Sequence, residues 1–243
     1  MKLDTKTVLV TGANRGIGAA IVRDLLKHKV GKVYAAARNI KTLPDFGDKR
    51  VVPLALDITD SKQVADAAKQ AEDVNILINN AGIATFSSIV EGQHDQIAAD
   101  MRVNYFGTVA MMQAFAPVLQ KNGQGVIANV VSVVGLAPIV SVGGYSASKA
   151  ALHSATQVAR TELASRNIHV AGIYPGPIDT DMARDFPMDK ASPAVTAQAI
   201  VAGIIEGKDY IFPDPMSQQV GALWEQNPTA LEKQFAAPMS DAA

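Results

Sequence analysis

The 243-residue sequence contains no cysteine. Disulfides are therefore excluded, and so are metal sites built from thiolates. Four histidines are present without the spacing typical of metal ligands: His28, His94, His153 and His169. We therefore expect no metal site. The absence of cysteine fits a reducing compartment, and we expect a cytoplasmic protein.

An excess of charge of either sign is also missing. The 22 lysines and arginines are balanced by 23 aspartates and glutamates, for a net charge of -1. This balance gives no electrostatic reason to expect binding to nucleic acid or to an anionic membrane surface.

Long apolar runs are lacking too. The most apolar region, residues 126–142, is short and is interrupted by polar residues, glycine and proline, so we expect no membrane span. Lys2, Asp4 and Lys6 precede the first strand-like run with no apolar segment ahead of it. We expect no secretory signal.

What the sequence does contain is a regular alternation of short β-branched runs with helical patterns. We expect strands at residues 7–10, 32–37, 50–56, 75–78, 125–131, 168–174 and 209–212. Strands that alternate with helices imply a parallel sheet covered on both faces, with right-handed crossovers. The predicted fold is an α/β, Rossmann-like doubly wound sheet of about seven strands.

The longest helical patterns cover residues 96–121 and 145–166. Asp60 is a suitable N-cap, and Ser192 followed by Pro193 starts a helix that runs to about residue 206.

No linker or internal repeat divides the chain, so we predict a single domain over residues 1–243. Residues 181–191 lack clean periodicity and should form a flap, and residues 213–243 form a C-terminal tail with helical stretches. Trp224 in this tail either lines a pocket or packs against the core, and we favour packing.

The first strand runs directly into a glycine loop, Thr11-Gly12-Ala13-Asn14-Arg15-Gly16-Ile17-Gly18, which opens a helix. Strand, glycine turn and helix in this order form the first half of a dinucleotide-binding unit. Glycines let the backbone approach a pyrophosphate, and the helix N-terminus presents N–H groups to it.

The end of the second strand indicates which dinucleotide. NAD enzymes usually place an acidic residue there to hold the ribose 2′-hydroxyl, whereas this chain has Ala37 followed by Arg38. A guanidinium binds a 2′-phosphate bidentately, and Arg15 could reach it from the other side. The alternative is two solvated surface arginines. We predict NADP(H) rather than NAD.

Ligands of doubly wound sheets bind beyond the carboxyl ends of the strands. Six residues follow the expected strand ends and should converge there: Gly12, Arg38, Asp57, Asn80, Ser132 and Pro175.

Tyr145 and Lys149 lie four residues apart and share one face of a helix. An ammonium favours the phenolate, so we expect the pKa of Tyr145 to fall below its ordinary value and the residue to be a candidate proton donor. Taken alone, the pair also occurs by chance on surface helices. Asn104 lies in the middle of a helical pattern among apolar neighbours, and we expect it to be partly buried with hydrogen-bond partners.

In this order and at these separations, the motifs resemble the short-chain dehydrogenases/reductases of the usual single-domain type, up to about residue 212. The matching pieces are Thr11-Gly12-x-x-x-Gly16-x-Gly18, Asn79-Asn80-Ala81-Gly82, Asn104, Ser132, Tyr145-x-x-x-Lys149 and Pro175-Gly176-Pro177-Ile178-Asp179-Thr180.

The resemblance implies catalytic roles. Tyr145 would donate a proton to a substrate carbonyl, and Lys149 would lower the pKa of that tyrosine and bind the nicotinamide ribose. Ser132 would hold the carbonyl oxygen, and Asn104 would fix a water molecule near the lysine. The implied cofactor-binding residues are Gly12, Asn14, Arg15, Ile17, Gly18, Arg38, Asp57, Ile58, Asn80, Ala81, Gly82, Tyr145, Lys149, Pro175, Gly176, Ile178 and Thr180.

The activity implied is reversible, NADPH-dependent reduction of a ketone or aldehyde to an alcohol, by a homo-oligomer (dimer or tetramer). The expected walls of the substrate pocket hint at an apolar substrate: Phe86, Val134, Leu136, Phe186 and Met188. The alternatives are a non-catalytic NADP-binding scaffold or sensor, and another chemistry of the family such as epimerisation or halide elimination. Halide-eliminating relatives replace the lysine and degrade the glycine loop, and this chain does neither.

Overall fold

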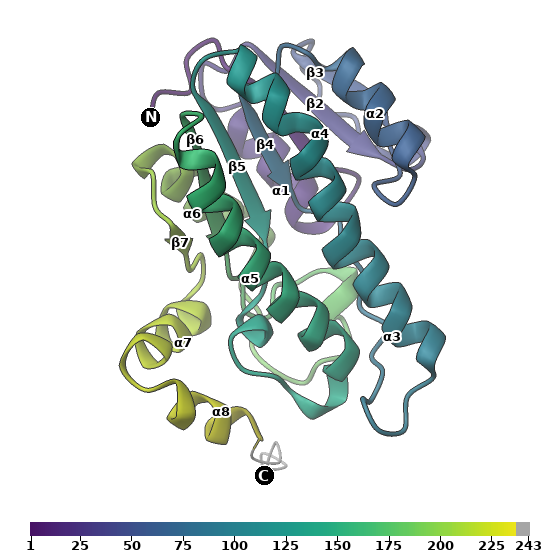
Figure 1. Cartoon of the computed structure of the whole chain (residues 1–243), viewed down its shortest axis with the longest axis vertical. Coiled ribbons are helices and arrows are strands. Elements are labelled where there is room, and N and C mark those ends of the chain that lie inside the picture. Colours follow the sequence, from purple (N-terminus) through teal and green to yellow (C-terminus); the bar gives the residue numbers. More distant parts are fainter. Residues whose placement is uncertain (237–243) are drawn as a thin grey trace.

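A computed structural model describes residues 1–236. Its core is a seven-stranded sheet in the order β3-β2-β1-β4-β5-β6-β7, with every neighbouring pair parallel (Figure 1). The strands are β1 Thr7–Thr11, β2 Lys32–Ala37, β3 Val51–Ala55, β4 Ile76–Asn79, β5 Gly125–Val130, β6 Ile168–Ile173 and β7 Tyr210–Ile211. The predicted doubly wound fold is confirmed.

Helices cover both faces of the sheet. They are α1 Gly16–Leu25, α2 Ser61–Gln70, α3 His94–Asp100, α4 Thr108–Lys121, α5 Gly143–Ala164, α6 Pro193–Glu206, α7 Pro215–Gln226 and α8 Pro228–Ala236. Along β1, Val8 and Val10 pack in the apolar layer under α1 and α6, while Leu9 packs under α2, α4 and α5. This alternation is the two-residue period of a strand buried on both faces.

The helical pattern expected over 96–121 is confirmed, but the middle of this helical run is π-helical rather than α-helical. α3 ends at Asp100, a π-helical segment follows over Met101–Gly107, and α4 begins at Thr108. Asn104 lies in this segment and its side chain bonds to the backbone of Ile83 instead of to solvent. Such π-helical turns are frequent at functional sites.

Two predicted helix starts are confirmed. Asp60 caps α2 by accepting hydrogen bonds from the N–H groups of Lys62 and Gln63, and Ser192 caps α6 ahead of Pro193. Among residues 1–236, no helix combines the length and apolar character needed to cross a bilayer.

The C-terminal helices α7 and α8 lie beyond the carboxyl ends of the strands (Figure 1). Trp224 of α7 packs edge-on to His153, with ring centroids 5.6 Å apart, and contacts Tyr210 at 5.5 Å. Packing, the interpretation favoured for Trp224, is confirmed. The rest of the expected tail, 237–243, lies outside the described residues.

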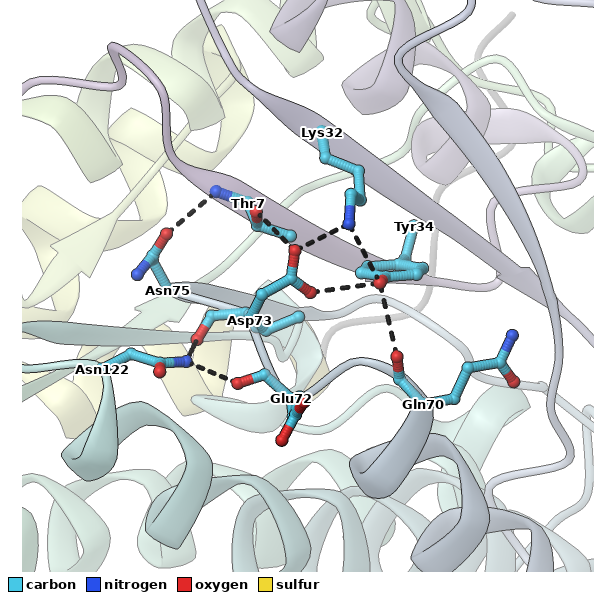
Figure 2. Close-up of polar contacts among 9 residues, drawn as sticks. Thr7, Lys32, Tyr34, Gln70, Glu72, Asp73, Asn75 and Asn122 are labelled. Carbon is cyan, nitrogen blue, oxygen red and sulfur yellow. Dashed lines mark hydrogen bonds and ion pairs between the residues drawn. The ribbon is translucent and has the colours of Figure 1, made fainter.

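A polar cluster ties the amino ends of the strands together (Figure 2). The carboxylate of Asp73, just before β4, accepts hydrogen bonds from Lys32 Nζ at 2.7 Å, Tyr34 OH at 3.1 Å and Thr7 Oγ1 at 3.2 Å. Burial of this carboxylate opposes its ionisation, but the hydrogen bonds from Lys32 and Tyr34 prevail and the pKa of Asp73 is lowered.

Candidate active site

A cavity of about 490 Å³ lies at the carboxyl ends of the strands. The six residues expected to converge there all line it: Gly12, Arg38, Asp57, Asn80, Ser132 and Pro175. Other residues singled out from the sequence line it as well: Asn14, Arg15, Ile17, Ile58, Ala81, Gly82, Tyr145, Lys149, Gly176, Ile178 and Thr180. Gly18 and Asn104 do not line it and lie behind its wall.

The glycine loop shapes one side of this cavity. Gly12 and Gly16 have φ angles of 64° and 54°, a region that favours glycine. A Cβ on Gly18 would lie 2.2 Å from the Gly12 carbonyl oxygen, so the loop can fold back on itself only without that side chain. Asn80 Nδ2 secures the loop by donating to the carbonyls of Thr11 and Gly12.

The N-terminus of α1 completes this side. No side chain caps the helix, and its first turn contains no acidic residue. Its first N–H groups therefore remain available beside Gly16 and Ile17, which line the cavity. Uncapped N–H groups and close glycines suit a pyrophosphate, so the residues present fit a dinucleotide.

The two arginines differ in their surroundings. Both Arg15 and Arg38 line the cavity, and no carboxylate follows the end of β2. Arg15 Nη1 forms an exposed ion pair with Asp181 Oδ2 at 3.0 Å. A 2′-phosphate would therefore compete with the first residue of the flap for Arg15.

Tyr145 and Lys149 extend from the first turns of α5, which begins at Gly143 rather than at the tyrosine. Lys149 Nζ lies 5.5 Å from the centre of the Tyr145 ring and donates to the Val130 carbonyl at 2.8 Å. The helix thus brings the ammonium and the phenol together in the cavity.

The expected fall in the pKa of Tyr145 is wrong. Burial raises the pKa of Tyr145 to about 12, although a hydrogen bond with Ser132 opposes the rise. Burial also lowers the pKa of Lys149 to about 7, against the charge of Asp100. Desolvation outweighs the pairing because protein surrounds both groups, with Lys149 buried and Tyr145 half-buried. Tyr145 is consequently protonated at neutral pH, the state that a proton donor needs.

Asn104 is completely buried, and both ends of its side-chain amide have hydrogen-bond partners. Its Oδ1 accepts from the Ile83 N–H, and its Nδ2 donates to the Ile83 carbonyl and to Ser148 Oγ, each at 2.9 Å. A Cβ on Gly82 would meet both Asn104 Oδ1, at 3.0 Å, and Lys149 Nζ, at 3.6 Å. The expected burial with partners is confirmed, and the amide lies near the lysine.

Ser132 follows β5 and is buried. Its Oγ accepts from the Val134 N–H at 3.3 Å and contacts the Pro175 carbonyl at 3.4 Å. The hydroxyl therefore lies between the end of β5 and the loop that follows β6, beside Tyr145.

Apolar side chains line the rest of the cavity. Of the expected walls, Phe86, Val134, Phe186 and Met188 line it. Leu136 does not, because it packs on the buried side chains behind the cavity. The rings of Phe86 and Phe186 lie 5.7 Å apart and connect the loop after β4 with the flap. Phe86 has a φ of 53°, a strained value for an aromatic residue.

The sequence did not single out several lining residues, among them Ile139, Val142 and Met216. Met216 belongs to α7, and no motif in the tail points to the cavity. Within residues 1–236, no group of three or more histidine, aspartate or glutamate side chains could hold a metal ion.

Comparisons with known proteins agree with this geometry. The family model described as short chain dehydrogenase matches residues 6–191. An uncharacterized oxidoreductase of Staphylococcus aureus is 33% identical over 219 residues, which cover 85% of this chain and 94% of that protein.

Solved structures are similar as well. A short chain dehydrogenase from Burkholderia cenocepacia in complex with NADP is 38% identical, with a TM-score of 0.93 over 98% of this chain and 100% of that one. A short chain dehydrogenase/reductase from Burkholderia phymatum in complex with NAD has a TM-score of 0.84 over 99% of both chains, but at 24% identity it shows the fold alone. The chain belongs to the short-chain dehydrogenase family and is an oxidoreductase of that type.

Proposed function

We propose that the protein reduces an apolar ketone or aldehyde to the corresponding alcohol with NADPH, and catalyses the reverse oxidation. The observation that carries the proposal is the meeting of Tyr145, Lys149 and Ser132 in a cavity that the glycine loop also lines. A proton donor and a dinucleotide cradle in one cavity are what carbonyl reduction requires.

The proposal that the cofactor is NADPH rests on the positive charges beside the cavity. The end of β2 offers Arg38 instead of a carboxylate, and Arg15 lies on the glycine loop. The relative from Burkholderia cenocepacia was solved with NADP. The N-terminus of α1 would hold the pyrophosphate, and Asp57 and Ile58 would flank the adenine. Asn80, Ala81 and Gly82 would lie beside its ribose, while Ile178 and Thr180 would anchor the carboxamide.

When bound, NADPH supplies the hydride that reaches the carbonyl carbon. Tyr145, protonated at neutral pH, gives its hydroxyl proton to the carbonyl oxygen as that oxygen gains charge. Ser132 Oγ holds the same oxygen in place. Lys149, with a pKa of about 7, exchanges protons near neutrality and can restore the phenol, while Asn104 would fix a water molecule beside the lysine.

Apolar walls support an uncharged substrate. Phe86, Val134, Phe186 and Met188 line the cavity, whereas its arginines and aspartates come from the strand ends and the flap. A charged substrate group between these walls would lose its hydration without finding a partner.

The test is a panel of ketones, aldehydes and alcohols assayed by nicotinamide absorbance, with NADPH and NADH in parallel. We expect turnover of apolar ketones with a preference for NADPH, and little turnover of charged keto acids. Tight NADPH binding without turnover of any compound would instead support a non-catalytic NADP-binding protein, and epimerisation without net cofactor oxidation would support another chemistry of the family.

A further inference from the structure

We propose that Asp214, in the C-terminal segment, is a positioning residue: it fixes the peptide plane that Ser132 contacts and sets the loop of residues 175–180 against the nicotinamide. This inference rests on the proposed cofactor binding. It makes the C-terminal segment a component of the active site, although no motif in that segment suggests such a role.

The carboxylate of Asp214 bridges two elements. The residue is 2% exposed and is the N-cap of α7. Its Oδ1 accepts the N–H of Ser217 at 2.9 Å, and its Oδ2 accepts the N–H of Gly176 at 2.8 Å. One oxygen therefore serves the helix and the other serves the loop after β6.

The Gly176 N–H and the Pro175 carbonyl belong to the same planar peptide unit. That carbonyl accepts from the Val133 N–H at 3.1 Å and contacts Ser132 Oγ at 3.4 Å. Asp214 thus holds one edge of the plane while Ser132 lies at the other edge. A rotation of the plane would displace the hydroxyl proposed to hold the substrate oxygen.

Gly176 lies in close contact with the start of α7. A Cβ on Gly176 would lie 2.8 Å from Asp214 Oδ1 and 3.4 Å from the Met216 side chain. Met216 lines the cavity and packs in the same apolar cluster as Tyr145. The start of α7 therefore contacts both the loop and the surroundings of the proton donor.

A helix cap alone does not explain the choice of residue. Serine, threonine or asparagine caps a helix about as well as aspartate. The N–H groups of Ser217 and Gly176 each require an acceptor oxygen. Of these side chains, only a carboxylate offers two acceptor oxygens and no donor. Burying that charge is costly unless both oxygens are bonded, so the carboxylate is explained by its second contact, the one with Gly176.

The experiment separates the two roles of Asp214, which are capping α7 and bonding to Gly176. Asp214→Ser keeps a capping oxygen but is too short to reach Gly176, and Ser217→Ala weakens the cap while leaving the carboxylate in place. The affinities of each variant and of the wild-type chain are measured for NADPH and for 2′,5′-ADP, which lacks the nicotinamide.

We expect Asp214→Ser to weaken NADPH binding about tenfold, as for the loss of one hydrogen bond to a charged group, and to lower kcat. Its affinity for 2′,5′-ADP and both affinities of Ser217→Ala should stay near the wild-type values. If Asp214→Ser fails to fold, Asp214→Asn decides: its oxygen can cap α7 while its NH₂ opposes the Gly176 N–H, and the same selective loss is expected.

Wild-type NADPH affinity in the Asp214 variants would overturn the inference. An equal loss for both ligands, shared by Ser217→Ala, would overturn it too, because it would show a purely structural cap. If the wild-type chain binds neither ligand, the proposed function itself is overturned, and the inference with it.

Discussion

Desolvation sets the protonation of the two residues that the sequence pairs most clearly. The spacing of Tyr145 and Lys149 predicted their shared helix face, and the structure has it. The direction of the Tyr145 pKa shift could not be predicted, because it depends on how deeply surrounding strands and loops bury each group. A four-residue spacing carries no information about that depth.

The buried lysine leads to a prediction about stability. The folded pKa of Lys149 is about 7 against an ordinary value of 10.5, so between these values the unfolded chain binds more protons. Stability should therefore rise with pH from 7 towards 10, by at most about 1.4 kcal/mol per pH unit. The raised pKa of Tyr145 removes stability only above pH 10.

Urea unfolding of the wild-type chain and of Lys149→Met at pH 7, 8 and 9 measures this contribution. The variant should be the more stable at pH 7, and its advantage should shrink as the pH rises. Parallel pH profiles would show that Lys149 does not titrate in this window.

Cofactor choice is a second prediction at the residue scale. Arg38→Asp places a carboxylate where a 2′-phosphate would lie, so the ratio of kcat/KM for NADPH to that for NADH should fall by about tenfold or more. Arg166→Asp makes the same charge change at an exposed site after α5 and is the control. An unchanged ratio in Arg38→Asp would mean that another group selects the cofactor.

At the scale of elements, local sequence signals predicted where helices start better than where their α-helical geometry changes. Asp60 and Ser192 act as caps because capping depends on the residue and its immediate neighbours. The π-helical segment of residues 101–107 could not be predicted, because the bonds of Asn104 go to Ile83, far away in the sequence.

The cluster around Asp73 at the amino ends of the strands should stabilise the fold without affecting the site (Figure 2). Asp73→Asn removes the ion pair with Lys32, and because both groups are partly exposed we expect a loss of about 1 kcal/mol. Asp66→Asn, which breaks the exposed pair with Lys62, should leave the free energy of unfolding nearly unchanged.

Chemical denaturation at pH 7 checks the stability of both variants. The destabilisation by Asp73→Asn should disappear as the pH falls through the lowered pKa of Asp73, where the carboxylate becomes protonated. An Asp73→Asn variant as stable as the wild-type chain at pH 7 would contradict the assignment.

At the scale of the whole molecule, the topology of the sheet made most of the candidate site predictable. Parallel strands bring the residues after their carboxyl ends to one edge of the sheet. Gly12, Arg38 and Ser132 therefore line the same cavity although they are far apart in the chain. Residues of the site that do not follow a strand end were not predicted from the sequence. Met216 and Asp214 come from the tail, and their position depends on how α7 packs, which no local pattern encodes.

Assembly into a dimer or tetramer remains a prediction. Phe106 and Val158, on the long helical segments before and after β5, are 60% and 53% exposed, and an interface between two chains would bury them. Sedimentation should give two or four times the chain mass of 25.6 kDa, and Val158→Glu should reduce it. A wild-type mass of a single chain would contradict this prediction.

The most direct test of the central claim, that Tyr145 supplies the proton, is the rate of ketone reduction by Tyr145→Phe with saturating NADPH. We predict a fall of about 100-fold or more, with the affinity for NADPH within about twofold of the wild-type value. Unchanged turnover in this variant would contradict the account.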